Sequence, residues 1–312
     1  MRVALTGATG YVGSYVLRAL LRRGHTPRCL VRGPGPAPAA QDTDLAVQDD
    51  AIEIASGDVT DPGSLDGAFA DCDAVIHLVG IIEEKRAKGV TFERLHVGGT
   101  RHVVEAAQAA GIDRFLHMSA NGARAENATD YQRTKWEAEQ IMKNAGFAHW
   151  SIFRPALLFG KPDPGRPEFS SRLLADLVRP FPVLPVFGDG QYELQPVHVT
   201  EVAAAFVQAL TTDAAHEQTY VVAGPDRFSY VEVLDRIAQG AGLAPKPKVH
   251  VPLAVARLGV YTAGRVGLLP ISPAQFEMLV EGNTGDETAF YRDFDLSPTA
   301  YTVENLQYLQ HM

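Results

Sequence analysis

Residues 6–13 read Thr-Gly-Ala-Thr-Gly-Tyr-Val-Gly. A short apolar run, Arg2–Thr6, leads into this stretch, and a pattern with helical spacing, Tyr11–Arg23, leads out of it. Glycines spaced G-x-x-G-x-x-G permit a tight turn, a close approach of backbone to a pyrophosphate, and close packing of helix on strand. The helix that follows would direct free N–H groups and its positive end at the same anion. The stretch therefore predicts a dinucleotide-binding turn between strand and helix; a glycine turn without a ligand is the weaker alternative.

The same alternation of apolar runs and helical patterns continues through the first half of the chain. Further strands are expected at Arg28–Arg32, Ile52–Ala55, Ala74–Gly80, Arg114–Ser119 and His149–Arg154. Helices are expected at Phe92–Ala110 and Thr129–Ala145, and another should begin at Asp61-Pro62, where Asp61 would cap it. Strand–helix alternation at this pitch implies parallel pairing with helices on both faces. The sequence thus predicts an α/β fold with a Rossmann-type, doubly wound parallel sheet.

The pattern changes after Arg154, where a proline-rich region begins. We expect residues 1–158 to form the dinucleotide-binding domain, to which a segment near 194–224 returns. Residues 159–312 are expected to form a smaller, mostly helical domain that binds a substrate or partner. The spacing of Ser229 and Glu232 matches a capping box and predicts the start of one of its helices. A stretch rich in proline and glycine, Gly33–Ala40, predicts an exposed and mobile loop.

Composition limits the class of protein. The chain has 312 residues, with 28 Lys and Arg, 37 Asp and Glu, and a formal charge of −9, which argues against a nucleic-acid binder. Two cysteines, Cys29 and Cys72, cannot build a disulfide framework and suit a reducing compartment. No export signal precedes the first strand, and no apolar run reaches the roughly 18 residues of a membrane span. The sequence therefore predicts a cytoplasmic protein, either free or peripheral to a membrane.

The tip of the second strand bears on the choice of dinucleotide. An acidic side chain there would accept hydrogen bonds from the adenosine ribose and favour NAD(H). This chain has Arg32 instead, whose guanidinium can bind the 2′-phosphate of NADP(H). The residues therefore favour NADP(H), with NAD(H) as the alternative and a solvated loop charge as the other role for Arg32. Asp58 and Val59, after the third strand, are expected beside the adenine, although Asp58 can instead cap the turn at Asp61.

Several motifs appear in one order along nearly the whole chain, and together they resemble the extended short-chain dehydrogenase/reductase superfamily. They are residues 6–13, Gly57-Asp58-Val59, Gly99-Thr100, Tyr131-x-x-x-Lys135, Arg154-Pro155 and Pro196-Val-His-Val-Thr200. Ser119–Ala123 and Ser272–Phe276 are similar to an atypical branch of the superfamily. That branch contains the NADPH-binding accessory subunit of respiratory complex I and its bacterial relatives.

The resemblance and the glycine loop together imply a set of cofactor contacts at the carboxyl ends of the strands. The expected contacts are Gly7, Thr9, Gly10, Tyr11, Val12, Gly13, Arg32, Asp58, Val59, Leu78, Val79, Ser119, Tyr131, Lys135, Pro155 and Leu157. The backbone after Arg154 would meet the nicotinamide amide, or it makes a plain turn at the end of a strand.

Tyr131 and Lys135 lie four residues apart and would share one helix face. A lysine charge near a phenol favours the phenolate, so we expect Lys135 to lower the pKa of Tyr131. Such a tyrosine could exchange a proton with substrate while hydride moves to or from nicotinamide, so both residues are candidate catalytic residues. An ordinary surface pair is the alternative. Two other positions depart from the superfamily pattern: Ala120 stands where a Ser or Thr is usual, and His96 where an Asn is usual.

These departures favour cofactor binding over turnover. The sequence predicts a low-turnover NAD(P)(H)-dependent oxidoreductase, or a subunit that the cofactor stabilises, and it does not indicate the substrate. The alternatives are a sugar-nucleotide epimerase or dehydratase, and a structural or assembly factor of a respiratory complex. No metal site is expected, because the histidines and cysteines lack ligand spacing. Residues 251–269 are mostly apolar, with a buried helix, a protein-docking surface and a membrane-interface helix as the three interpretations.

Overall fold

The central sheet has seven strands in the order β11-β6-β5-β4-β1-β2-β3. The computed structural model describes residues 1–33, 51–262 and 271–312. From β3 to β6 every neighbouring pair in the sheet runs parallel, which confirms the predicted doubly wound arrangement. The strands are β1 (Arg2–Thr6), β2 (Thr26–Val31), β3 (Glu53–Ser56), β4 (Ala74–His77), β5 (Arg114–Met118), β6 (His149–Pro155) and β11 (Gln218–Val222).

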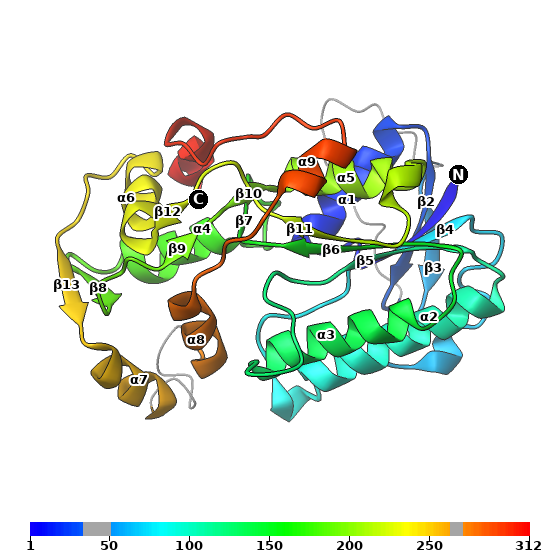
Figure 1. Ribbon diagram of the computed structural model, residues 1–312, viewed down its shortest axis with the longest axis horizontal. Coiled ribbons are helices and arrows are strands. Elements are labelled where there is room, and N and C mark those ends of the chain that lie inside the picture. Colours follow the sequence, from blue (N-terminus) through cyan, green and yellow to red (C-terminus); the bar gives the residue numbers. More distant parts are fainter. Residues whose placement is uncertain (34–50, 263–270) are drawn as a thin grey trace. The chain divides into compact units, whose positions relative to one another are not determined.

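Helices cover both faces of this sheet (Figure 1). One face carries α1 (Tyr11–Arg22), α5 (Val199–Gln208) and α9 (Thr288–Asp293). The other carries α2 (Gly99–Ala109) and α3 (Asp130–Lys143), with the π-helical turn η4 (Glu93–Gly98) ahead of α2. Short 3-10 turns lie at η2 (Pro62–Leu65), η3 (Arg86–Lys88) and η6 (Asp213–Ala215).

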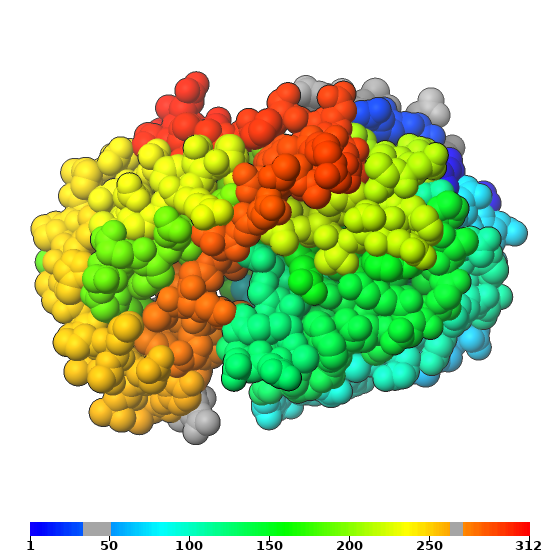
Figure 2. Space-filling view, viewed as in Figure 1, coloured from blue at the N-terminus to red at the C-terminus, as the bar shows by residue number. Residues whose placement is uncertain are grey.

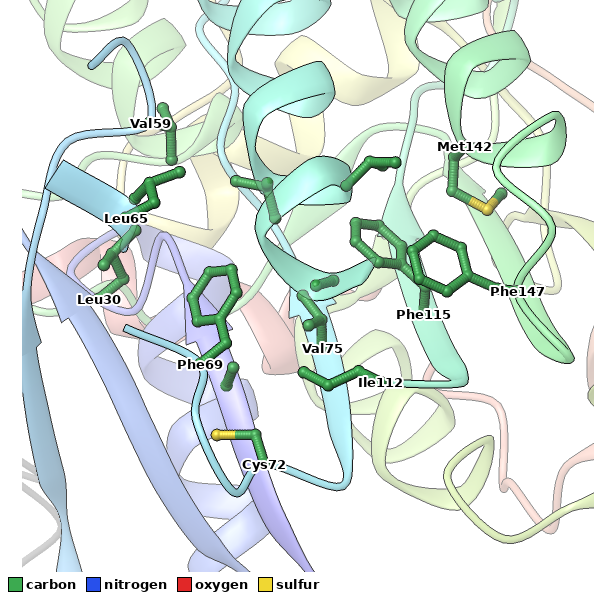
Figure 3. Close-up of a cluster of buried hydrophobic side chains, with 14 of the residues drawn as sticks. Leu30, Val59, Leu65, Phe69, Cys72, Val75, Ile112, Phe115, Met142 and Phe147 are labelled. Carbon is green, nitrogen blue, oxygen red and sulfur yellow. The ribbon is translucent and has the colours of Figure 1, made fainter. Parts of the chain in front are cut away.

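One hydrophobic core of the sheet lies on the α2 and α3 face. Val75 of β4, Phe115 of β5 and Ile152 of β6 are fully buried there. Figure 3 shows Phe115 beside Phe147 and Met142, and the two phenyl rings have centroids 4.9 Å apart. A parallel sheet covered on both faces needs continuous apolar strands, which explains why these strands read as short hydrophobic runs.

The chain divides into two compact units. The first unit holds Met1–Pro155, Val199–Val221 and Thr288–Ser297, and it contains the sheet. The second holds Ala156–His198, Val222–Glu287 and Pro298–Met312. The expected boundary at residue 158 and the returning segment near 194–224 remain predictions, and the assignment of residues 288–297 to the first unit was not anticipated.

The second unit is built from short elements around its own buried cluster, which includes Phe159, Leu234 and Leu306. Its helices are α4 (Phe169–Leu173), η5 (Leu174–Val178), α6 (Tyr230–Gly240), α7 (Leu253–Thr262), α8 (Pro273–Glu281) and η8 (Glu304–His311). Its strands are β7 (Leu158–Phe159), β8 (Leu184–Phe187), β9 (Glu193–Leu194), β10 (Val197–His198), β12 (Phe228–Ser229) and β13 (Lys248–Val251), paired as β10-β7, β12-β9 and β13-β8. In the described parts of the chain, no helix is both long and apolar enough to cross a membrane.

Local signals predicted some element boundaries correctly and others wrongly. Ser229 and Glu232 form the expected capping box at the start of α6. Asp61 was expected to cap a helix, but its side chain makes no cap hydrogen bond and only the 3-10 turn η2 follows. The backbone N–H of Ser64, which a side-chain cap would bind, donates instead to the carbonyl oxygen of Asp61 at 3.1 Å. The Ser64 hydroxyl also bonds within this turn, donating to Asp61 O at 2.7 Å and accepting from Asp58 N at 2.8 Å. The expected mobile loop, Gly33–Ala40, lies beyond Gly33 outside the described residues.

Candidate functional site

The glycine loop folds back tightly between β1 and α1. Gly7 has φ +80°, a conformation that L side chains rarely adopt, and a Cβ there would lie 3.1 Å from the carbonyl carbon of Leu78. The same Cβ would lie 3.2 Å from the backbone nitrogen of Val79. The loop therefore packs directly on the chain that leaves β4, which brings Gly7, Leu78 and Val79 together as predicted.

The other two glycines have different tasks. A Cβ at Gly13 would lie 2.0 Å from Gly7 O, so Gly13 lets helix α1 meet the turn. Of the residues the structure describes, a Cβ at Gly10 would meet only Gly7 O, at 3.2 Å, and Gly10 is exposed, so space is open above it. Gly10 is also the N-cap of α1 and offers no side chain to its first N–H groups. Thr9 is exposed beside it, and α1 begins at Tyr11 and Val12, so this end of the helix can present backbone donors to an anion.

The expected adenosine side is marked by Arg32 and Asp58. Arg32 directly follows the last residue of β2 and is exposed. Asp58 Oδ1 accepts hydrogen bonds from the backbone nitrogen and hydroxyl of Thr60, both at 2.8 Å. Burial raises the pKa of the Asp58 carboxyl, but the Thr60 bonds and the charges of Arg32 and Arg94 outweigh it and leave this pKa below its ordinary value. The carboxylate therefore serves a local turn and also faces the Arg32 charge.

Val59 lies deeper than Asp58 and is buried. A Cβ at Gly99 would lie 3.1 Å from its Cγ2, and its carbonyl accepts from Nδ1 of His102 at 2.8 Å. These contacts lock the start of α2 against the chain after β3. Val59 thus packs beneath the expected adenosine site and is not exposed at it.

A row of buried polar side chains crosses the sheet beneath the loop. Thr6 of β1 pairs in register with His77 of β4, and His77 pairs with His117 of β5. Nδ1 of His77 lies 2.6 Å from Thr6 Oγ1, and Nε2 lies 3.1 Å from Thr100 Oγ1 on α2. Burial and the charge of Lys135 lower the pKa of His77 to about 3. His77 is therefore a neutral, hydrogen-bonded core imidazole.

His117 and Ser119 continue this row with unsatisfied polar atoms. Both side chains are buried. Within the described chain, neither ring nitrogen of His117 has a hydrogen-bond partner, and the hydroxyl of Ser119 has none either. Burial, followed by the charges of His77 and Lys135, holds the pKa of His117 far below its usual range. Ser119 N donates to Phe153 O at 2.7 Å, so the pairing of β5 with β6 continues one residue past Met118. Ser119 therefore shares a face with His117 and keeps a hydroxyl available for a ligand or water.

Tyr131 and Lys135 lie on one face of α3, as the sequence predicts. Lys135 is buried, and its Nζ donates to the carbonyl oxygen of Met118 at 3.2 Å. A Cβ at Gly80 would lie 2.7 Å from this Nζ, so Gly80 makes room for the ammonium. Burial lowers the pKa of Lys135 to about 8, against the opposing charge of Glu139.

The expectation that Lys135 lowers the pKa of Tyr131 is wrong for this structure. Burial raises the pKa of the Tyr131 phenol to about 12. The ring packs edge-on against Phe92 and His96, with centroids 5.6 and 5.5 Å away, while the ammonium is held at Met118. Tyr131 is therefore a protonated phenol at neutral pH.

His96 occupies the position where the superfamily usually has Asn, and it is fixed on both sides. The Thr134 hydroxyl donates to Asp130 O, so it accepts from Nδ1 of His96, 3.0 Å away. Nε2 then accepts from Ile81 N at 3.1 Å. Burial and the charge of Lys135 lower the pKa of His96 to about 2. The His96 imidazole is therefore neutral and packs against the Tyr131 ring.

One functional neighbour was missed at the sequence level. Glu139 is fully buried one turn after Lys135, and Arg154 binds it through two hydrogen bonds, Nε to Oε1 at 2.8 Å and Nη2 to Oε2 at 2.6 Å. The pair ties α3 to β6 and fixes the helix that carries Tyr131 and Lys135. The spacing of Tyr131, Lys135 and Glu139, each four residues after the last, was the available signal.

Two other predicted contacts have backbone roles. Pro155 ends β6, and its carbonyl accepts from Asn121 N at 2.9 Å. Leu157 belongs to the second unit, where its carbonyl accepts from Val197 N at 2.8 Å. In the first unit, one group of predicted contacts lies at the carboxyl ends of β1 to β4: the glycine loop, Leu78, Val79, Arg32, Asp58 and Val59. A second group lies at the end of β5 and on α3: Ser119, Tyr131 and Lys135. Leu157 is not a residue of the first unit.

Comparison with known proteins shows the family to which the chain belongs. The model of the NAD dependent epimerase/dehydratase family matches residues 3–223. Ceramide reductase of Caulobacter vibrioides is 30% identical over 262 residues, which cover 84% of this chain and 76% of that protein. The mitochondrial NADH-ubiquinone oxidoreductase 40 kDa subunit of Neurospora crassa is 28% identical over 233 residues, which cover 74% of this chain and 58% of that subunit. The resemblance to the superfamily and its complex I branch is therefore confirmed.

The fold also has counterparts among solved structures. The crystal structure of UDP-glucuronic acid 4-epimerase from Bacillus cereus in complex with NAD superposes with a TM-score of 0.71 at 19% identity. The match covers 100% of this chain and 98% of the epimerase. At this level of identity the likeness shows a shared fold.

Proposed function

Since the chain belongs to the NAD dependent epimerase/dehydratase family, we propose that its first unit binds a nicotinamide dinucleotide across the carboxyl ends of β1, β2 and β4. The residues fit such a cofactor, because the space above Gly10 is open and Gly7 and Gly13 hold the turn closed beneath it. Gly10 leaves the first N–H groups of α1 without a side-chain cap, as a pyrophosphate site requires.

NADP(H) is the favoured form, with NAD(H) as the alternative. The support is Arg32, an exposed guanidinium at the tip of β2 where an acidic residue would select NAD(H). Asp58 is near enough for the Arg32 charge to lower its pKa, so this carboxylate can help orient the guanidinium. A 2′-phosphate would take charge-assisted hydrogen bonds from Arg32.

We propose that the cofactor is held firmly and turned over slowly. Two observations carry this proposal: Lys135 Nζ donates to Met118 O, and burial raises the pKa of Tyr131 to about 12. When bound, nicotinamide supplies a hydride donor or acceptor. Tyr131 would keep its proton at neutral pH and could donate it, but it would be a poor base. Lys135 would serve chiefly to hold the nicotinamide ribose.

A second candidate function is the reduction of a lipid carbonyl. The supporting observations are a protonated Tyr131, the unpartnered hydroxyl of Ser119, and the likeness to a ceramide reductase across 76% of that protein. A phenol that keeps its proton at neutral pH can still donate it to the alkoxide that forms in the reductive direction, and Ser119 could donate to the carbonyl oxygen. A sugar-nucleotide epimerase is less favoured because it must also remove a proton. A cofactor-stabilised subunit of a respiratory complex fits the slow-turnover proposal equally.

The contact expected through residues 251–269 is a separate proposal. Its described part, 251–262, carries α7, while residues 263–269 lie outside the described chain. We assign the contact with a partner surface to α7.

The test of the cofactor proposal begins with nucleotide release from purified protein by denaturation, followed by chromatography. We expect NADP(H) to be recovered and calorimetry to give tighter binding for NADPH than for NADH. Failure of both nucleotides to bind would contradict the proposed function. Assays with NADPH and lipid ketones, against assays with NADP and the matching alcohols, separate the second candidate from a slow-turnover protein, since only the former predicts a fast reductive reaction.

A further inference from the structure

Helix α7 buries little of its surface. Ala256 and Val260 are its buried side chains, and they pack with Phe276 of the neighbouring helix α8. Two small or medium side chains are enough to dock a ten-residue helix against α8. The rest of its surface faces outward.

The outward side of α7 is apolar, where a surface helix normally carries polar residues. We call this set of side chains the α7 surface; their exposed fractions are Leu253 37%, Val255 60%, Leu258 69% and Tyr261 40%. A single exposed hydrophobic residue is ordinary, but several together mark an interaction site. The helix lies at the periphery of the second unit, and its side chains form part of the visible face (Figures 1 and 2).

The surrounding sequence has a charge opposite to that of the whole protein. Residues 236–262 contain four of the 28 Lys and Arg residues and none of the 37 Asp and Glu residues. Among the described residues, Lys246 Nζ donates to backbone carbonyls, including that of Phe181 at 2.7 Å, and is not paired with an acid. Lys248 is paired with Asp235, and Arg257 is paired with Glu277 while its side chain stays 52% exposed. The segment itself thus carries basic and no acidic side chains in a protein of net charge −9, with Lys246 not paired to an acid in the described chain and Arg257 still half exposed.

We propose that the α7 surface inserts into the interface of an anionic lipid bilayer. The inference deepens the proposed contact role of residues 251–262 and is independent of dinucleotide binding. A helix with exposed aliphatic side chains and flanking basic residues gains from apolar burial and from attraction to anionic headgroups. Tyr261, with an apolar ring and a hydroxyl, suits the boundary between acyl chains and headgroups.

A second copy of the chain is a poorer occupant of the same surface. In a two-fold dimer the same patch meets itself, so the basic segments of both copies would be brought together. An acidic surface removes this repulsion, and a bilayer containing anionic lipid supplies such a surface together with an apolar interior. Charge complementarity therefore favours the bilayer.

The test is flotation of the full chain with vesicles of phosphatidylcholine, alone or containing about one third phosphatidylglycerol. We expect binding to the anionic vesicles, weak binding to the neutral ones, and a decrease at high salt. The double variant Val255→Asp, Leu258→Asp should lose at least about tenfold in partitioning, because each buried aliphatic side chain contributes more than a tenfold change requires. Ile54→Asp, which alters a side chain 44% exposed on β3, is the matched control and should bind as the wild type does.

Two results would overturn the proposal. One is equal binding of the double variant and the wild type to anionic vesicles. The other is absence of vesicle binding by the wild type. If the wild type then has a doubled mass in solution and the double variant does not, a second copy of the chain is the occupant of the α7 surface. Nucleotide affinity and melting temperature are measured for each variant. Unchanged values show that a loss of vesicle binding comes from the α7 surface, and they keep this outcome separate from any failure of the cofactor proposal.

Discussion

His117 stacks on His77 with ring centroids 5.4 Å apart and planes 21° from parallel, yet the two imidazoles have opposite hydrogen-bonding states. His77 is held by Thr6 and Thr100, whereas neither nitrogen of His117 has a partner within the described chain. Both are buried next to the charge of Lys135, and both are therefore neutral at physiological pH. The pair makes the core of the first unit sensitive to acid.

Stability should fall as the pH drops below about 6.5. The unfolded chain then binds protons on His77, His96 and His117, while the folded chain does not, since the pKa values of His77 and His96 are lowered to about 3 and about 2. More protons on the unfolded state means that the free energy of unfolding decreases with falling pH, by up to about 1.4 kcal/mol per pH unit for each group. Thermal melts between pH 7.5 and 4.5 measure the slope.

The variant His117→Leu isolates one of these groups. It removes an unsatisfied buried polar side chain, so we expect an equal or higher melting temperature at pH 7.5 and a shallower loss on acidification. His149→Leu, at a half-buried histidine, is the comparison variant. A steeper acid loss in His117→Leu would show that His117 is protonated, or partnered, in the folded protein.

Gly10→Val should fold and lose dinucleotide binding. Within the described part of the chain its Cβ would meet only Gly7 O, at 3.2 Å, so the valine side chain would stand in the open space above the loop where the pyrophosphate is expected. We expect at least a hundredfold weaker binding by calorimetry, roughly 2.7 kcal/mol. Gly13→Ala differs, because its Cβ would lie 2.0 Å from Gly7 O and must disturb the backbone. A Gly10→Val protein that folds and binds with wild-type affinity would place the cofactor elsewhere.

Arg32→Asp should exchange the preferred nucleotide. The substitution removes the guanidinium proposed to bind the 2′-phosphate and provides an acceptor for the ribose hydroxyls. We expect NADPH to bind at least about tenfold more weakly and NADH to bind more tightly, a change of about 1.4 kcal/mol or more for NADPH. Arg22→Asp, at the end of α1, controls for the general effect of charge. If dissociation constants for both nucleotides stay equal in wild type and variant, Arg32 has no part in the choice.

The parts of the fold that local patterns encode could be predicted from the sequence. The glycine spacing, the strand–helix alternation and the capping box of Ser229 and Glu232 depend on residues a few positions apart. Asp61 does not cap a helix because the N–H of Ser64, three residues on, donates to its backbone carbonyl and not to its side chain. The expected continuous helix is instead π-helical over its first turns, from Glu93. His96 lies in this π-helical part, and its hydrogen-bond partners, Ile81 and Thr134, belong to other parts of the chain.

The chemistry of the site was less predictable, because it depends on strand register. Thr6, His77 and His117 become neighbours only when β1, β4 and β5 pair, and no spacing along the chain shows this. The spacing of Tyr131 and Lys135 correctly placed both on one face of α3. It could not show that the ammonium turns to Met118 O, nor that burial dominates the pKa of the phenol.

The Glu139–Arg154 pair should contribute strongly to stability. Glu139 is fully buried, so Arg154→Met leaves an unpaired carboxylate in the interior and should cost about 3–5 kcal/mol in urea unfolding. The double variant Glu139→Leu, Arg154→Met removes both charges and should recover much of that loss. If the double variant is no more stable than Arg154→Met alone, the cost comes from lost packing of the arginine stem and not from the stranded charge.

Lys135→Met and Tyr131→Phe should separate cofactor binding from catalysis. Methionine keeps the length of the lysine stem in the space left by Gly80 but removes the ammonium that would hold the nicotinamide ribose. We therefore expect Lys135→Met to reduce the rise in melting temperature that NADPH produces, since that rise follows the dissociation constant. Tyr131→Phe retains the ring that packs on Phe92 and His96, so its response to NADPH should match that of the wild type.

Because the phenol has a pKa of about 12, both wild type and Tyr131→Phe should give little oxidation of alcohols at neutral pH. A substrate turned over faster than about 1 per second, with Tyr131→Phe abolishing the reaction, would contradict slow turnover and make Tyr131 a catalytic residue. In that case Ser119→Ala tests the oxygen-binding donor, because the hydroxyl of Ser119 is buried and has no partner in the described chain. A drop of about 100-fold or more in kcat with nucleotide affinity unchanged would assign it that task.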